Sequence, residues 1–124
     1  MLESASAHAT IAVTDLDGAK AFYGGTLGLP VKEERSDGVL YECGGTWFLV
    51  YPSEFAAPSG STRMTFDVTD LDTTVKELRA AGVTFEEYDF PGLKTVDGIA
   101  EIQGARGAWF KDPEGNIIAV GQRT

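Results

Sequence analysis

The stretch Val-Thr-Asp-Leu-Asp occurs twice in the chain, at residues 13–17 and again at residues 68–72. A chain of 124 residues rarely repeats five residues in a row by chance. Self-similarity of this kind is the usual mark of a duplicated structural unit. The repeat therefore predicts that the chain folds as two copies of one unit.

The residues before each copy of the stretch predict a strand. Their apolar and polar side chains alternate over about seven residues, and this period of two places one set on each face of a strand. Each strand thus has an apolar face and a mixed, partly polar face. The mixed faces carry His8, Thr10 and Ala12 in the first copy and Arg63, Thr65 and Asp67 in the second.

Each copy of the stretch then marks the start of a helix. Its side-chain oxygens can accept hydrogen bonds from the unpaired N–H groups of a first helical turn, and its acids suit the positive end of a helix dipole. Apolar residues continue at helical spacing up to Gly28 in the first copy and Gly82 in the second, where glycine can end a helix. The candidate N-caps are Thr14 or Asp15 and Thr69 or Asp70.

Three strand-like segments follow each helix. The pair Gly44–Gly45 predicts a hairpin turn, and "DPEGN" at 112–116 predicts a turn in which Pro113 presets φ and Gly115 allows a positive φ. The segments are 31–36, 38–44 and 46–52 in the first copy and 83–90, 106–112 and 116–122 in the second.

The chain is therefore predicted to be a single α+β domain over residues 1–124, built from two βαβββ modules. Module one covers about residues 6–52 and module two covers about residues 63–122. Residues 53–62 form a linker that is rich in Ser, Ala, Pro and Gly.

Residues 91–105 have no counterpart in the first module and predict an insertion. A loop of this length inside a small domain is usually functional or mobile, and this one contains a candidate short strand at 99–103. Gly92, Gly98 and Gly104 would let the loop close over a ligand. A contact between two chains and a merely mobile loop are the alternatives.

Composition narrows the class of partner. Nineteen acids against ten Lys and Arg give a net charge of −9, which would repel the phosphate backbone of a nucleic acid. No apolar run reaches membrane-spanning length, so we expect no membrane partner. The first ten residues lack the apolar core of a secretory signal, and Cys43 is the only cysteine. These two features lead us to expect a reducing, cytoplasmic location.

The repeat, together with "HATIAVTDLDGAKAFYGGTLGL" at 8–29 and "WFKDPEGNIIAV" at 109–120, resembles the vicinal oxygen chelate superfamily. This superfamily includes glyoxalase I, extradiol dioxygenases, and the fosfomycin and bleomycin resistance proteins. The resemblance runs from His8 to Gln122. It implies that the two modules form a curled mixed sheet around a cavity, with the helices on the outer face, and that two chains pair as a homodimer.

The resemblance also implies four positions for metal ligands, of which this chain fills one. His8 stands where the first strand of module one supplies a ligand, and Arg63 stands at the corresponding position of module two. Leu49 and Ala119 stand where the last strand of each module would supply a carboxylate. A guanidinium has no available lone pair, and alkyl side chains cannot coordinate. We therefore predict no metal site of the usual kind and no cofactor, and a divalent metal is disfavoured.

Other roles for the polar residues stay open. Histidine is the residue type most often used as a general base, so His8 is a candidate for that role, while a simple hydrogen-bonding role in a pocket is the alternative. Asp67 can pair with an arginine or help to hold a ligand, or it can form a solvated salt bridge. Glu42 and Glu101 could complete an atypical metal site with His8, although nothing in their spacing requires this.

Aromatic residues are the candidates to fill the cavity in place of a metal. Trp47 lies two residues before Leu49 and so shares its face, which should point into the cavity. The resemblance implies that Phe110 packs under the helix, so Trp109 is expected to point the same way. Tyr41 is a further candidate, with ordinary core packing as the alternative for all three aromatic residues.

These residues lead to a predicted function and two alternatives. The first is a protein that binds a small aromatic or carbonyl-bearing metabolite or antibiotic without a metal, in the manner of the bleomycin resistance proteins. Arg63 would let the site accept an anionic group. The second is a lyase, isomerase or dioxygenase-type enzyme that uses His8 as a base or in an atypical metal site. The third is a regulatory or structural subunit. The predicted binding residues are His8, Thr10, Tyr41, Trp47, Leu49, Arg63, Asp67, Trp109 and Ala119.

Overall fold

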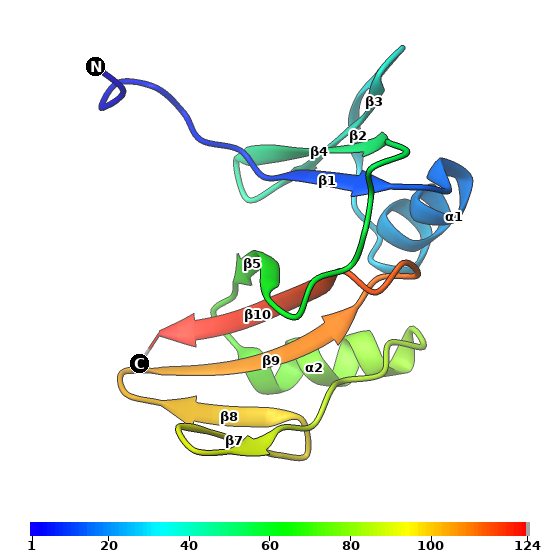
Figure 1. Cartoon of the computed structure of the whole chain (residues 1–124). Coiled ribbons are helices and arrows are strands. Elements are labelled where there is room, and N and C mark those ends of the chain that lie inside the picture. The colour runs from blue at the N-terminus through cyan, green and yellow to red at the C-terminus, as the bar shows by residue number, and fades with distance from the viewer. Residues whose placement is uncertain (124) are drawn as a thin grey trace. The chain divides into compact units, whose positions relative to one another are not determined.

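The protein consists of two compact units, each built on its own mixed β-sheet (Figure 1). The computed structural model describes residues 1–123. The first unit is Met1–Ala57 and the second begins at Pro58, so the boundary lies inside the segment expected to be a linker. None of the helices in these residues is long and apolar enough to cross a membrane.

The first unit has a four-stranded sheet in which the first and last strands lie side by side. β1 pairs with β4 in parallel, whereas the β4–β3 and β3–β2 pairs are antiparallel. The turn between β3 and β4 has positive φ at both Gly44 and Gly45, as predicted for a hairpin. The strands are β1 (Thr10–Val13), β2 (Val31–Arg35), β3 (Gly38–Cys43) and β4 (Thr46–Pro52).

The helix of the first unit is split into two kinds of turn. Asp15 is the N-cap of α1 (Leu16–Lys20) and accepts a hydrogen bond from the backbone N–H of Gly18. A π-helix, η1 (Ala21–Thr26), follows directly, where the spacing predicted one continuous α-helix. The widened turn brings Tyr23 into the core, where its side chain is fully buried. Gly28 has a positive φ of 69° just beyond the end of η1.

The second unit repeats this arrangement and adds to it. β5 and β10 pair in parallel, and β9, β8, β7 and β6 follow in antiparallel order. The helix α2 (Leu71–Ala80) begins after its N-cap Asp70, which accepts from the Thr73 N–H, and Gly82 follows with a φ of 99°. The strands are β5 (Thr62–Asp67), β6 (Asp89–Phe90), β7 (Leu93–Val96), β8 (Ile99–Ile102), β9 (Ala105–Lys111) and β10 (Ile117–Arg123).

The insertion forms the β7–β8 hairpin and joins the sheet. β8 confirms the candidate strand at 99–103, whereas β7 was not predicted. β8 takes the place beside β9 that β2 takes beside β3, so it replaces the segment 83–90 as the counterpart of β2. Segment 83–90 was predicted as a strand, but only Phe85, bridged to Phe110, and the short β6 pair with neighbours. β8 pairs with the edge of β9 along which segment 83–90 would have to form a continuous ladder of hydrogen bonds.

Each sheet packs one face against its own helix. In the first unit Tyr23 of η1 contacts the rings of Tyr41 and Phe48, with centroids 6.0 and 5.7 Å apart. In the second unit Phe110 and Ile118 are direct partners on β9 and β10, and both are buried. The α+β class is therefore confirmed, with the helices on one face of two open mixed sheets.

Candidate functional site

The predicted site residues of the first unit centre on His8 and Trp47. The two rings stack with centroids 3.5 Å apart and an angle of 11° between their planes. Thr10 pairs with Leu49 across β1 and β4, and the N–H of Leu49 donates to the carbonyl of Ala9. The register therefore brings these four predicted residues together on one part of the first sheet.

A backbone hydrogen bond determines which nitrogen of His8 carries the proton. Nδ1 lies 2.8 Å from the carbonyl oxygen of Trp47. A carbonyl oxygen can only accept, so Nδ1 must donate, and in the neutral ring the lone pair is then on Nε2. The hydroxyl of Thr46 lies at 3.5 Å from the same Nδ1. Nε2 is thus the atom through which His8 can accept a proton or a hydrogen bond.

Tyr41 lies in the core of the first unit and not beside Trp47. It pairs with Phe48 across β3 and β4, so its side chain is on the helix-covered face, and only 1% of its surface is exposed. Trp47 is the neighbour of Phe48 in sequence and therefore points to the other face. Burial raises the pKa of the Tyr41 phenol, and the Glu34 carboxylate raises it further while the Lys20 ammonium opposes this. We therefore leave Tyr41 out of the candidate site.

In the second unit Arg63 stands at an irregularity of the sheet. Thr62 pairs with Ile117 and Met64 pairs with Ile118, so Arg63 is the extra residue of a β-bulge. Simple alternation along the strand did not predict this bulge. Asp67, which pairs with Gly121 at the end of β5, is exposed.

Trp109 is a direct partner of Ala119 across β9 and β10. Two small residues leave room for its indole on this face. One is Ala119, and the other is Gly107, where an added Cβ would lie 3.3 Å from the indole Cη2. The indole therefore occupies space that larger side chains at these positions would take.

Trp109 lines an open groove together with two other aromatic residues. The ring of Tyr88 contacts Trp109 edge-on at 5.8 Å between centroids and contacts Phe90 at the same centroid distance. Leu93 and Ile117 add apolar surface, and the groove has a volume of about 480 Å³. We call this feature the aromatic groove. Of the predicted site residues in the described part of the second unit, Trp109 alone lines it.

The polar groups of the aromatic groove form a nearly neutral set. The ammonium of Lys111 lies 3.3 Å from the carboxylate of Glu86, and the N–H of Glu86 donates to the carbonyl of Trp109. Burial raises the pKa of the Tyr88 phenol, the Glu86 charge raises it further, and Lys111 acts in the opposite direction. Tyr88 therefore keeps its hydroxyl proton at neutral pH and can donate it to a ligand.

The sequence contained a signal for the residues that were missed. In "EEYDF" at 86–90 the residues Glu86, Tyr88 and Phe90 alternate along one side, and all three line the groove. The prediction treated this segment as an ordinary strand. Its aromatic side chains become groove residues because the inserted β7 pairs with β6 and brings Leu93 opposite Phe90.

The residues at the positions implied for a metal do not fit one. Leu49 lies beside the strand that follows His8, and the counterpart of Leu49 in the second sheet is Ala119. Neither side chain has a donor atom, and Arg63 is cationic. Among residues 1–123 no group of three or more His, Cys, Asp and Glu side chains is placed to hold a metal ion.

Solved structures share this fold over nearly their whole length. A glyoxalase family protein from Bacillus anthracis has a TM-score of 0.72 at 19% identity, with all of both chains covered. The fosfomycin resistance protein FosX from Listeria monocytogenes has a TM-score of 0.70 at 18% identity, covering 98% of this chain and 94% of that one. Lactoylglutathione lyase from Agrobacterium tumefaciens has a TM-score of 0.68 at 21% identity, covering 96% and 93%. At these identities the likeness concerns the fold.

Sequence comparison with a family model gives the assignment. No curated protein sequence is significantly similar to the chain. The model of the Glyoxalase/Bleomycin resistance protein/Dioxygenase superfamily, in contrast, matches residues 5–120. This match includes both repeated stretches and both βαβββ modules, in agreement with the resemblance found from the sequence. The chain therefore belongs to the Glyoxalase/Bleomycin resistance protein/Dioxygenase superfamily.

Proposed function

We propose that the protein binds a small, flat aromatic or carbonyl-bearing metabolite or antibiotic in the aromatic groove, without the usual metal centre. The observation that carries this proposal is the row of contacting rings formed by Trp109, Tyr88 and Phe90 along the groove. Ligand pockets are mostly apolar with a few polar groups that orient the ligand. Aromatic rings supply flat surface on which a second ring can stack.

The polar groups favour a ligand with a neutral polar edge. The charges of Lys111 and Glu86 compensate each other at 3.3 Å, so neither sign is strongly preferred. The Tyr88 hydroxyl can donate a hydrogen bond to a carbonyl oxygen. The likeness to a fosfomycin resistance protein supports an antibiotic as one class of ligand to test.

The test is a titration of the protein with aromatic metabolites and aromatic antibiotics, in which binding is measured by calorimetry or by tryptophan fluorescence. Trp109→Leu should weaken binding by about tenfold or more, because the stacking surface is removed. Trp47→Leu is the matched control and should leave the affinity within about twofold, since Trp47 does not line this groove. Chromatography should recover the ligand unchanged. Equal affinities for the wild type and Trp109→Leu would exclude the aromatic groove as the site.

A second titration separates the two candidate cations. The sequence alone suggested Arg63 as the partner of an anionic ligand, whereas the structure has Lys111 in the lining of the groove. We expect Lys111→Met to change the affinity for a carboxylate-bearing aromatic compound more than Arg63→Ala does. A larger effect of Arg63→Ala would move the anion site towards the β5 bulge.

The proposed absence of a metal has its own test. The purified protein is incubated with Ni²⁺, Zn²⁺, Mn²⁺ and Fe²⁺, and the bound metal is measured by elemental analysis. We expect less than stoichiometric metal, because Arg63, Leu49 and Ala119 offer no ligands beside His8. Stoichiometric metal that is lost in His8→Ala would establish an atypical centre.

Enzymatic turnover is a second candidate function, favoured by the orientation of His8. The Trp47 carbonyl holds Nδ1–H, so Nε2 is available to take a proton from a substrate. Lyase, isomerase and epoxide-opening assays with S-lactoylglutathione and fosfomycin test this candidate. Turnover that disappears in His8→Gln would support it, and turnover that persists in this variant would remove His8 as the base.

We also propose that the protein acts as a homodimer that binds its small-molecule ligand. The resemblance to dimeric members of the superfamily supports this state. Sedimentation equilibrium should give twice the chain mass at micromolar concentration. A monomer mass over the same range would overturn the proposal.

A further inference from the structure

A second groove lies on the helix-covered face of the second sheet, between α2 and the β7–β8 hairpin. Its volume is about 760 Å³, and we call it the helix–hairpin groove. Ile99 lines this groove and pairs with Ala108 across β8 and β9. Trp109 follows Ala108 along β9, so its side chain points to the other face of the sheet. The groove is therefore separate from the aromatic groove.

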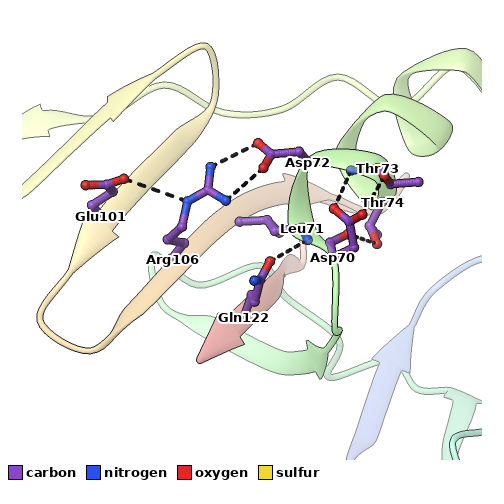
Figure 2. Close-up of polar contacts among 8 residues, drawn as sticks. All are labelled: Asp70, Leu71, Asp72, Thr73, Thr74, Glu101, Arg106 and Gln122. Carbon is purple, nitrogen blue, oxygen red and sulfur yellow. Dashed lines mark hydrogen bonds and ion pairs between the residues drawn. The ribbon is translucent and has the colours of Figure 1, made fainter. Parts of the chain in front are cut away.

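Two arginines connect the walls of the helix–hairpin groove. Arg106 of β9 donates two hydrogen bonds of 2.9 Å to the Asp72 carboxylate on α2, and Glu101 lies 3.8 Å from its Nε (Figure 2). Arg79, two turns further along α2, donates from Nη2 to the carbonyl of Asp97 in the hairpin turn at 2.6 Å. The Arg79 guanidinium also lies over the ring of Phe85, 5.5 Å from its centroid. These contacts hold the helix and the hairpin in place, so the groove is preformed.

Cations are concentrated in this groove although the chain is acidic. Four of the ten Lys and Arg residues line it, against three of the nineteen acids. Two of those acids, Asp72 and Glu101, lie against Arg106. Lys76 and Lys94, in contrast, form no ion pair with any described residue. The rest of the groove has Lys76, Arg79 and Lys94 against the single acid Asp97, so it carries excess positive charge.

Apolar side chains lie beside these cations. Val75 is buried under the groove, Ile99 is half-buried, and Val96 is 67% exposed. An occupant that matches both features has an anionic head and an aliphatic body. We propose that the helix–hairpin groove binds an amphipathic organic anion, an aliphatic carboxylate or phosphate monoester, with the head between Lys76 and Lys94 and the chain on Val96 and Ile99. This site is independent of the proposed aromatic ligand.

Calorimetric titration of the full chain with octanoate and with octyl phosphate, below their micelle concentrations, tests the proposal. Lys94→Glu and Lys76→Glu should each weaken binding by about tenfold or more, since each reverses a charge at the head. Lys32→Glu makes the same change of charge in the first unit and should leave the affinity within about twofold. Each methylene added between hexanoate and decanoate should tighten binding by about threefold to fourfold. The tighter of octanoate and octyl phosphate identifies the class of head group.

Three results would overturn the proposal. Octyltrimethylammonium could bind as tightly as octanoate, Lys32→Glu could lose as much affinity as Lys94→Glu, or octanoate binding could disappear in Trp109→Leu. The last result would place the anion in the aromatic groove. Because Lys76→Glu, on α2, changes no residue of the aromatic groove and Trp109→Leu changes no residue of the helix–hairpin groove, failure of one proposal is distinguishable from failure of the other.

Discussion

The two modules have the same strand pairing but different side chains on the face away from the helix. In the first sheet Leu49 pairs with Leu40, and at the equivalent pair of the second sheet Ala119 faces Trp109. The second sheet thus has a large and a small side chain, Trp109 and Ala119, where the first sheet has two leucines. The two modules therefore share a backbone arrangement, as expected for duplicated units. They differ in the sizes of the side chains on the helix-free face, and the small Ala119 leaves room there for the indole that lines the aromatic groove.

The same registers show that the two tryptophans are not counterparts. Trp47 pairs with Glu42, and the equivalent pair in the second sheet is Ile117 and Lys111. Trp47 stacks on a histidine of its own unit, while Trp109 lines a groove. The modules therefore differ in what their helix-free faces offer to a ligand, and the following changes test how far this difference extends.

The largest effect is expected where the modules agree, in the core. Tyr41 and Phe110 occupy equivalent positions, and each has 1% of its surface exposed. Tyr41→Ala and Phe110→Ala should each lower the free energy of unfolding by about 3–5 kcal/mol in urea titrations. Phe55→Ala, at a site with 86% exposure, is the control and should change it by less than about 0.5 kcal/mol. A small effect of Tyr41→Ala would return Tyr41 to the candidate site.

A smaller and asymmetric effect is expected at a pair of equivalent glycines. Gly38 has a φ of 152°, and a Cβ there would lie 2.4 Å from the carbonyl oxygen of Val50. Gly38→Ala should therefore cost about 2 kcal/mol or more, because the backbone must move. At Gly107 the added Cβ meets the Trp109 ring at 3.3 Å and the Val120 carbonyl oxygen at an ordinary contact distance of 3.7 Å, so Gly107→Ala should cost less than about 1 kcal/mol while shifting the tryptophan emission. Equal costs at both sites would mean that Trp109 is as rigidly held as the backbone.

Removal of the N-cap aspartate should lower the melting temperature of the protein by different amounts at the two helices. Asp70 accepts from both the N–H and the hydroxyl of Thr73, and Gln122 accepts from the N–H of Leu71 at the same helix start (Figure 2). Asp70→Ala should lower the melting temperature by about 3–6 °C, and Asp15→Ala should lower it less because α1 has only five residues. Differential scanning calorimetry measures both. A larger loss in Asp15→Ala would reverse this order.

The smallest effect is a difference in acid sensitivity. Hydrogen bonds from Thr73 lower the pKa of Asp70, the Arg106 guanidinium lowers that of Asp72, and donation from Thr95 and then from the Gly98 N–H lowers that of Glu87. A carboxyl with a lowered folded pKa stabilises the protein above its ordinary pKa and loses this contribution as the pH falls through the folded value. Hydrogen-exchange protection factors, which compare each amide's rate with its intrinsic rate at the same pH, should therefore fall in the second module below about pH 4.

Salt is the control for this acid effect. The three carboxyls are exposed, so screening at high ionic strength should reduce the difference between the modules. In the first unit the hydrogen bond from the N-terminal ammonium lowers the pKa of Glu3, which lies outside module one. An equal loss of protection in both modules below about pH 4 would contradict the prediction.

Much of the fold could be predicted because its signals are local. The repeated Val-Thr-Asp-Leu-Asp stretch marked both helix starts, and side-chain alternation marked β3, β4, β9 and β10 within one residue. The bulge at Arg63 and the π-turns of η1 could not be predicted in this way. Both depend on how a strand or helix fits its neighbour, which is a long-range packing effect.

The candidate site was only partly predictable for the same reason. The resemblance to the superfamily led us to expect Trp109 on the helix-free face, and the structure has Trp109 in the lining of a groove. For Tyr41 the structure has the core-packing alternative. The sequence left this open because the face on which a residue lies depends on register, and a shift of one residue moves every side chain to the other face. Tyr88 and Phe90 became groove residues only once the insertion paired with their segment.

By itself the sequence predicted two βαβββ modules and determined that the chain is acidic, and the resemblance implied that His8, Arg63, Leu49 and Ala119 stand at the positions of metal ligands. The tertiary structure decided which aromatic side chains meet, which nitrogen of His8 is free, and that four cations gather between α2 and the β7–β8 hairpin. The reason is physical: periodicity and capping act over a few residues, whereas a groove forms between segments that strand pairing brings together from distant parts of the chain.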